Sequence, residues 1–269
     1  MAAAHRYGIQ AFAYSDIGKA RRTNEDSFIL ADLTRGTGID SNGILEFESG
    51  PRGSLFAVAD GMGGAAAGEM ASRLSLKAIY NELLQNSRNT LTIDALEQIL
   101  IDAVGTANRL VFDTGHSNRE FAGMGTTLTA VVEIHGRMVI GQIGDSRAYL
   151  IRDQSILQLT RDQSVVAQKV NNGEITEDQA RKHPERNILL QALGVTPTVE
   201  LCIIKTVVHP DDLILLCSDG LHSQMSAEEI NDIVLNSATE QDACFELVNT
   251  ANDRGGPDNI TAVLVRFIS

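Results

Sequence analysis

The chain has 269 residues, 43% of them hydrophobic and 21% charged, and its 35 acidic side chains outnumber its 22 basic ones to give a formal net charge of −13. Nucleic acids and anionic membranes bind proteins through basic patches, so this balance argues against both as partners. No apolar run reaches the roughly 18–20 residues that span a bilayer, and the N-terminal residues lack the basic start and apolar stretch of a signal peptide. We therefore expect a soluble, cytoplasmic protein with either one large domain or two small ones.

The cysteines agree with this location. Cys202, Cys217 and Cys244 show no CxxC spacing, and Cys217 lies inside an apolar run. We expect them to be small buried hydrophobic residues in a reducing compartment, and not a disulfide or a zinc site.

The first half of the chain alternates apolar runs with two long periodic segments. Ser27–Ala31 and Leu55–Ala59 predict strands. Residues 32–53, between them, are rich in glycine and polar residues and predict a long loop. Gly68–Leu84 and Ile93–Phe112 then repeat apolar residues at helical spacing, which predicts two helices.

The second half contains further strands around a polar segment. Strands are predicted at Thr127–Ile134, Met138–Ile143, Ala148–Ile151, Leu201–Val208, Leu213–Cys217 and Ile260–Ile268. Asp162–Leu193 predicts short helices in a mobile flap. Helices are predicted again at Ser226–Leu235, where Ser226 and Glu229 can form a capping box, and at Glu240–Asn252. This order predicts an α+β fold, a β-sandwich of two antiparallel sheets flanked by helices.

Acidic residues lie at the borders of five apolar runs. These acids are Glu25 with Asp26, Asp60, Asp145, Asp219 and Asp258. Any one of the sites is explained as a turn former. Strand ends in a packed sandwich can converge at one rim, however, and five carboxylate positions there would repel each other unless a cation lay among them. Ligation by oxygen alone selects Mg²⁺, Mn²⁺ or Ca²⁺ over zinc.

Two further residues suit such a site. An acidic protein that binds phosphate needs local positive charge, and the planar guanidinium of Arg21, four residues before Glu25, suits phosphate oxygens. Arg22 is the competing candidate. Gly61 follows Asp60, and because it has no Cβ its backbone can approach a ligand closely and its carbonyl is a possible ligand.

Six motifs occur in order along the chain. They are Gly18-x-x-Arg21-x-x-Asn24-Glu25-Asp26, Val58-Ala59-Asp60-Gly61-Met62-Gly63-Gly64, Gly123-Met124-Gly125-Thr126-Thr127, Gly144-Asp145-Ser146-Arg147, Ser218-Asp219-Gly220-Leu221 and Asp258-Asn259-Ile260-Thr261. Together they resemble the metal-dependent type 2C protein serine/threonine phosphatases, in their compact bacterial form. Each motif alone is weak, but six in this order are highly specific, and they span nearly the whole chain.

The resemblance implies a four-layer α-β-β-α fold, in which pairs of helices flank the two sheets. It implies a single catalytic domain over residues 1–269 with a flap at about 162–193 beside the active site. The implied function is hydrolysis of phosphoserine and phosphothreonine on proteins by direct attack of a metal-bridged water or hydroxide. The implied partners are phosphorylated proteins and a cognate Ser/Thr kinase, and we expect a monomer.

The resemblance also implies two or three Mn²⁺ or Mg²⁺ ions and assigns their ligands. Asp60 would bridge two metals, with the Gly61 carbonyl on one of them. Asp219 and Asp258 would hold the other metal. Asp145, with Asp219, would hold a weaker third ion.

The catalytic roles implied by the resemblance fall on three residues. Glu25 and Asp26 would act on the first metal and its waters, and Arg21 would grip the phosphate. Two positions depart from common family patterns. Met62 stands where the animal enzymes have a histidine proposed as a general acid, and Gln163 stands where many relatives have histidine.

Three other interpretations of the chain stay open at this point. It is also consistent with a phosphatase-fold module that binds phosphoproteins without turnover, with a calcium-stabilised structural sandwich, and with a hydrolase of small phosphate esters. The complete set of acids argues against the first. The second leaves Arg21 without a purpose.

Overall fold

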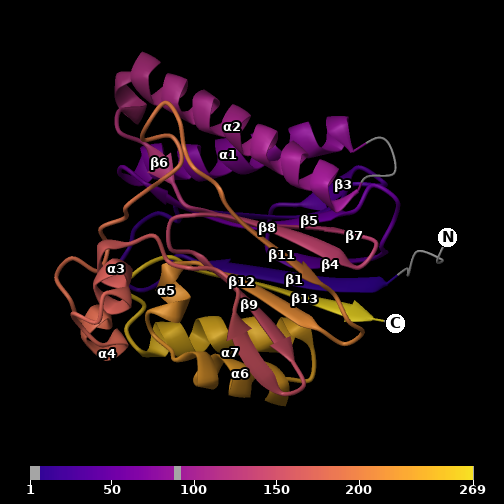
Figure 1. The fold of residues 1–269 in the computed structure, drawn as a ribbon. Helices are drawn as coiled ribbons and strands as arrows, with labels where there is room; N and C mark the ends of the chain where they lie inside the picture. The colour runs from indigo at the N-terminus through magenta and orange to yellow at the C-terminus, as the bar shows by residue number, and fades with distance from the viewer. Residues whose placement is uncertain (1–6, 88–91, 269) are drawn as a thin grey trace.

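The computed structural model describes residues 7–87 and 92–268. The strands form two antiparallel sheets stacked face to face, and helices cover their outer faces (Figure 1). The first six residues, on which the expected lack of a signal peptide rests, lie outside the described part of the chain.

The first sheet has six strands in the order β10-β9-β12-β13-β1-β4. They are β1 (Gly8–Asp16), β4 (Gly43–Glu48), β9 (Arg147–Arg152), β10 (Ser155–Gln158), β12 (Leu213–Cys217) and β13 (Ile260–Ile268). The earliest and the latest strand lie side by side at its centre, with Gly8 opposite Ile268 and Asp16 opposite Ile260.

The second sheet has the order β11-β8-β7-β5-β2-β3, and a short strand, β6, pairs with the end of β5. Its strands are β2 (Asp26–Asp32), β3 (Thr37–Ile39), β5 (Ser54–Met62), β6 (Gly125–Thr126), β7 (Leu128–Ile134), β8 (Arg137–Ile143) and β11 (Cys202–Val207). The register of β2 against β5 places Asp26 opposite Asp60.

Two pairs of helices complete the four layers. α1 (Ala65–Asn86) and α2 (Ile93–Ser117) cover the second sheet, and α6 (Ala227–Asn236) and α7 (Glu240–Asp253) cover the first (Figure 1). Buried apolar side chains fill the three spaces between the layers. The predicted α+β sandwich of two antiparallel sheets flanked by helices is confirmed. Within the described ranges, none of the helices combines the length and apolar character of a bilayer-crossing segment.

Local signals placed the C-terminal helices well. Ser226 accepts a hydrogen bond from the backbone N–H of Glu229, whose side chain accepts one from the N–H of Ser226, so the predicted capping box is present. This pair satisfies two of the N–H groups that every helix start leaves without an intrahelical partner.

The predicted loop over residues 32–53 is wrong, because it contains β3 and β4. Both are edge strands, each paired on one side only. In β4 Leu45 and Phe47 turn inward, whereas Ile44, Glu46 and Glu48 are exposed. An edge strand with one open face therefore lacks the continuous apolar run of a central strand.

The expected burial of the cysteines holds for Cys217 and Cys244, which are buried among the apolar side chains under α6 and α7. It is wrong for Cys202, which is partly exposed on β11. β11 is an edge strand, so one of its faces is incompletely covered.

The predicted polar segment, residues 162–193, holds two short helices, α3 (Val165–Asn171) and α4 (Glu177–Arg181). They lie at the end of the sandwich opposite the start of β1 and the end of β13, together with a third short helix, α5 (Asp219–His222) (Figure 1). We call residues 162–193 the flap segment. Its mobility remains a prediction.

Candidate metal centre and active site

The acidic residues converge where β2, β5 and β12 approach the flap segment. Asp60 and Asp26 face each other across β5 and β2. β5 continues to Met62, so Asp60 lies within the strand and not at its border as the sequence predicts. Asp219 follows β12 as the first residue of α5, a short helix that the sequence analysis does not anticipate.

Asp26 is held by hydroxyl groups from the opposite sheet. Ser218 Oγ and Thr261 Oγ1 both donate to Asp26 Oδ2, at 2.7 and 2.6 Å. The other oxygen, Asp26 Oδ1, is buried and has no hydrogen-bond partner. One side of this carboxylate is therefore fixed, and the other is presented to the site.

Asn259 joins the loop before β2 to the loop before β13. The Glu25 backbone N–H donates to Asn259 Oδ1 at 2.8 Å, and Asn259 Nδ2 donates to the carbonyls of Ile17 and Thr23 at 2.9 Å. Gly18 lies between these contacts with φ 77°, and a Cβ there would come within 2.1 Å of the Asp258 carbonyl oxygen. The two loops can approach each other because position 18 has no side chain.

Arg21 and Asp258, from these two loops, form an ion pair. Arg21 Nη2 donates to Asp258 Oδ2 at 2.7 Å, and the Arg21 side chain is 45% exposed. This hydrogen bond raises the pKa of Arg21 further above its usual range. Within the described ranges Arg22 makes neither a hydrogen bond nor an ion pair, so Arg21 is the arginine that meets the acids.

Gly61 and Gly68 allow Glu25 to fit beneath α1. A Cβ on Gly61 would lie 2.1 Å from the Gly68 carbonyl oxygen, and a Cβ on Gly68 would lie 2.0 Å from Glu25 Oε2. The lack of a side chain at Gly61 thus permits helix packing, and the close approach of its backbone to a ligand stays a prediction. The Glu25 side chain is buried, and burial raises the pKa of its carboxyl.

Asp145 lies in the turn before β9 and is also buried. Its carbonyl oxygen is 3.0 Å from Nε2 of His222, at the end of α5. Burial and the nearby Arg147 lower the pKa of His222 to about 3, so the ring is neutral. A carbonyl can only accept, so Nε2 carries the hydrogen in this contact.

The electrostatics of the cluster are those of crowded carboxylates. Burial, together with neighbouring aspartates, raises the pKa of Asp60 and of Asp145 well above the usual range. The same causes raise the pKa of Asp26 to about 7 and that of Asp219 to about 6. A hydrogen bond with the Asp60 side chain offsets part of the rise in the pKa of Asp219.

The donor set fits a hard divalent cation. All the acidic side chains offer oxygen, and both Asp26 Oδ1 and Asp219 Oδ1 are buried without a hydrogen-bond partner. In residues 7–87 and 92–268, however, no group of three or more His, Cys, Asp or Glu side chains already stands in a metal-holding arrangement. The carboxylates have converged, but they would have to rotate toward a shared ion, and Asp258 would have to part from Arg21.

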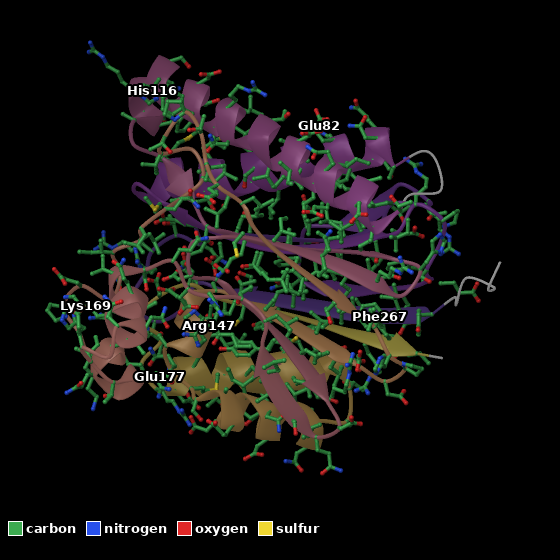
Figure 2. The ribbon with its side chains drawn as sticks, in the orientation of Figure 1. Glu82, His116, Arg147, Lys169, Glu177 and Phe267 are labelled. Atoms are coloured by element: carbon green, nitrogen blue, oxygen red, sulfur yellow. The ribbon has the colours of Figure 1, made fainter. Side chains whose placement is uncertain are left out.

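A cavity of about 830 Å³ opens beside the cluster. Asp145, Asp219, Asp258 and Arg21 line one side of it, and residues of α3 and α4 line the other. Figure 2 shows Arg147 inside this end of the molecule, with Lys169 and Glu177 of the flap segment at its outer edge. The cavity is much larger than a phosphate group, so the flap segment would contact whatever carries the phosphate.

Sequence reasoning missed the groups that hold the acids in place. Ser218, Thr261 and Asn259 lie within the quoted motifs but received no role, and His222 received none either. The signal available for the first three was their position immediately beside Asp219 and Asp258. Their partners, up to 246 residues away, could not be read from the chain.

Comparison with known proteins agrees with this geometry. The profile of the protein phosphatase 2C family matches residues 41–267. The serine/threonine phosphatase Stp of Listeria welshimeri is 34% identical over 251 residues, which cover 93% of both chains. The crystal structure of the Mycobacterium tuberculosis serine/threonine phosphatase PstP is 34% identical, with a TM-score of 0.81 over 97% of this chain and 100% of that one.

A second PstP structure bears on the metal. It is the catalytic domain in complex with two manganese ions, and it is 32% identical to this chain, with a TM-score of 0.80 over 98% of this chain and 100% of that one. The full PstP sequence is longer, and this chain spans 44% of it.

The profile, the relatives and the shared fold place this chain among the protein serine/threonine phosphatases. The chain belongs to the protein phosphatase 2C family. The predicted enzyme class, a protein serine/threonine phosphatase and thus a hydrolase, is confirmed.

Proposed function

We propose that this chain hydrolyses phosphoserine and phosphothreonine on proteins with two or three Mn²⁺ or Mg²⁺ ions held by its carboxylate cluster, and with water as the direct nucleophile. The observation that carries the proposal is the set of buried carboxylate oxygens that lack a partner. Leaving such groups unpaired costs about 1–3 kcal/mol each or more, so a site that keeps them needs a cation to offset the cost.

Asp60 would be the ligand shared between two ions, since it lies between Asp26 and Asp219 and shares a hydrogen bond with the latter. Asp219 and Asp258 would complete one position, and the Gly61 carbonyl would lie on the other. Asp145, whose pKa is raised by Asp219 among others, would hold a third ion with it. When bound, such cations supply positive charge that lowers the pKa of water and stabilises charge on a transferring phosphoryl group.

Glu25 and Asp26 would orient water on the side of α1. Asp26 suits this role because hydroxyls fix one of its oxygens and leave the other without a protein donor. Glu25 is packed against Gly68 and can move little. Both carboxyls would then accept hydrogen bonds from water without themselves becoming the nucleophile.

Arg21 would bind the phosphate of the substrate. Its guanidinium now rests on Asp258, and the exposed fraction of its side chain leaves it free to turn into the adjoining cavity. Once Asp258 binds a cation, the ion pair loses its acceptor, and phosphate oxygens become the natural partner of the guanidinium. Arg21 would therefore contribute mainly to substrate binding.

The dimensions of the cavity favour a phosphoprotein over a small ester, since one whole wall is formed by α3 and α4. A serine/threonine phosphatase acts on the products of a kinase, so we propose a cognate Ser/Thr kinase as its opposing partner. We place the enzyme in the cytoplasm and expect it to work as a monomer.

The test is phosphate release from phosphoserine, phosphothreonine and phosphotyrosine peptides in EDTA, Mg²⁺ or Mn²⁺. We expect hydrolysis of the first two peptides that depends on the metal and is absent from Asp219→Asn. Turnover that persists in EDTA would overturn the metal assignment. Turnover of p-nitrophenyl phosphate without any turnover of the peptides would favour a small ester as the substrate.

A further inference from the structure

We propose that Gln163 is a positioning residue that fixes the flap segment and the Asp145 turn to each other. One side chain would then set both a wall of the cavity and the place of a cluster carboxylate. The inference concerns the same cavity and rests on its proposed function.

Gln163 holds both backbone groups of one glycine. The Gly144 N–H donates to Gln163 Oε1 at 2.8 Å, and the Gln163 N–H donates to the Gly144 carbonyl at 2.9 Å. Gly144 has φ 91°, a conformation that glycine adopts readily, and Asp145 follows it directly. The turn that presents Asp145 is therefore attached to the first residues of the flap segment.

Gln163 also closes the base of the flap segment. The Leu190 N–H donates to the Gln163 carbonyl at 2.8 Å, and Gln191 Nε2 donates to Gln163 Oε1 at 3.3 Å. Gln191 in turn exchanges two hydrogen bonds with the backbone of Glu200, at 2.7 and 2.8 Å. The start and the end of the segment thus meet at one carboxamide oxygen.

The residues on either side of these contacts are fixed as well. Asp162 accepts hydrogen bonds from Nε and Nη2 of Arg147, at 2.9 and 2.7 Å, and both side chains are largely buried. His222 contacts the Asp145 carbonyl. The Gln163 contact is therefore the part of this network that joins the flap segment to the residue immediately before Asp145.

The chemistry of the contact identifies which substitutions keep it. The two side-chain contacts of Gln163 both use Oε1 as an acceptor. A leucine has similar size but no acceptor, whereas a glutamate keeps one oxygen in the same place. If Oε1 does the positioning, the glutamate variant retains the attachment and the leucine variant loses it.

The experiment compares Gln163→Leu, Gln163→Glu and the native chain. Hydrogen exchange of the Gly144 amide reports the contact itself, and steady-state kinetics on a phosphothreonine peptide and on p-nitrophenyl phosphate report its consequence. For Gln163→Leu we expect exchange to be about 3- to 10-fold faster, in line with the loss of one hydrogen bond. We expect the KM for the peptide to rise by about the same factor, while the KM for the small ester stays within about twofold.

Gln163→Glu should restore Gly144 protection and the peptide KM to within about twofold of the native values. The matched control is Gln98→Leu, because Gln98 bonds only to Asp102 on the exposed face of α2 and should change neither reading. Equal rises in KM for both substrates with a lowered Tm would show a general structural role and overturn the proposal. Unchanged Gly144 exchange in Gln163→Leu would also overturn the proposal. So would Gly144 exchange in Gln163→Glu that is as fast as in Gln163→Leu.

The exchange measurement needs no turnover. A native chain that hydrolyses neither substrate would refute the proposed function, and Gly144 exchange would still decide whether Gln163 makes the attachment.

Discussion

Both ends of the sandwich contain buried acids, but the acids at the two ends differ in their hydrogen-bond partners. At the end where β5 begins, Glu133 accepts hydrogen bonds from Ser54 Oγ at 3.1 Å and from the Gly136 N–H at 2.8 Å. Where β12 begins, Asp212 accepts from two nitrogens of Arg152, at 2.7 and 2.6 Å, and from the His209 N–H at 2.7 Å. These acids are satisfied by the protein itself.

At the other end of the same strands, the acids lack such partners. Asp26 and Asp219 each keep a buried oxygen without a hydrogen bond, and Asp60 lies opposite Asp26 and close to Asp219. Figure 2 labels Phe267, whose backbone N–H donates to the Asp212 carbonyl, and Arg147, which is two residues after Asp145. Asp32, at the end where β5 begins, also keeps one buried oxygen without a hydrogen bond, but Arg35 lies 3.7 Å from it. What distinguishes the Asp26 end is therefore that its buried carboxylates face one another.

The largest expected effect is the difference in activity between a substitution of Asp60 and a substitution of a buried acid at the opposite end. Asp60→Asn should lower the turnover of a phosphothreonine peptide in Mn²⁺ by about 10³-fold or more, since it removes the proposed shared ligand. The fold should be kept, because a neutral side chain relieves repulsion. The matched control is Glu133→Gln, in β7 opposite the start of β5. Its turnover should stay within about threefold of the native rate. Comparable rates in the two variants would contradict the proposed functional difference between the two ends.

For stability we expect the reverse order: a substitution of Asp212 should lower the free energy of unfolding more than a substitution of Asp26. Asp212→Ala leaves Arg152 and the His209 N–H without their acceptor, and we expect it to lower the free energy of unfolding by about 3–4 kcal/mol. Urea denaturation measures this loss, and activity per folded molecule should be unchanged. Asp26→Asn, measured alongside, should lose little or no stability in EDTA. A loss in Asp26→Asn as large as that in Asp212→Ala would contradict the comparison.

The free energy of unfolding of the metal-free protein should depend on pH through the acids of the cluster. The pKa of Asp26 is raised from 3.8 to about 7 in the folded protein, so its contribution is present below pH 4 and is lost as the pH rises through about 7. In EDTA the Asp26 carboxyl should therefore lower the unfolding free energy by about 2–3 kcal/mol between pH 5 and pH 8. The raised pKa values of Asp60, Asp145 and Asp219 act in the same direction. Mn²⁺ should restore the unfolding free energy at pH 8. A profile that Asp26→Asn leaves unchanged would assign the pH effect elsewhere.

The smallest effect concerns substrate binding. Arg21→Ala should raise the KM for phosphate esters by about tenfold, the loss of one charge-assisted contact, while Mn²⁺ affinity measured by calorimetry is retained. Arg22→Ala is the neighbouring control and should behave like the native chain. If instead Arg22→Ala raises the KM and Arg21→Ala does not, the phosphate contact belongs to Arg22.

The sequence predicted best the strands with continuous apolar runs. Leu213–Cys217 and Ile260–Ile268 were located to the residue because both faces of these strands are covered and their apolar runs are continuous. The edge strand β4 and the inner strand β1 were both missed, since polar residues interrupt their apolar pattern. Element ends also depend on tertiary contacts, such as the pairing of Gly61 and Met62 with β6.

The convergence of the acids was predictable from their positions, but their environment was not. That Arg21 pairs with Asp258, 237 residues away, depends on how two loops meet. Nor could a motif indicate that Gly61 leaves room for α1, or that Gln163 grips Gly144. These contacts depend on packing between segments that are distant in the sequence.

The adjacency of β1 and β13 has a consequence for how the enzyme comes into being. The loop that carries Arg21 follows β1, and the loop that carries Asp258 precedes β13, so the two meet only when these strands have paired. A ribosome releases β13 long after β1, and every partner that Asp258 and Thr261 supply is missing until then. We therefore expect nascent chains to be catalytically silent, so that an unfinished copy cannot erase phosphorylation before its synthesis is complete.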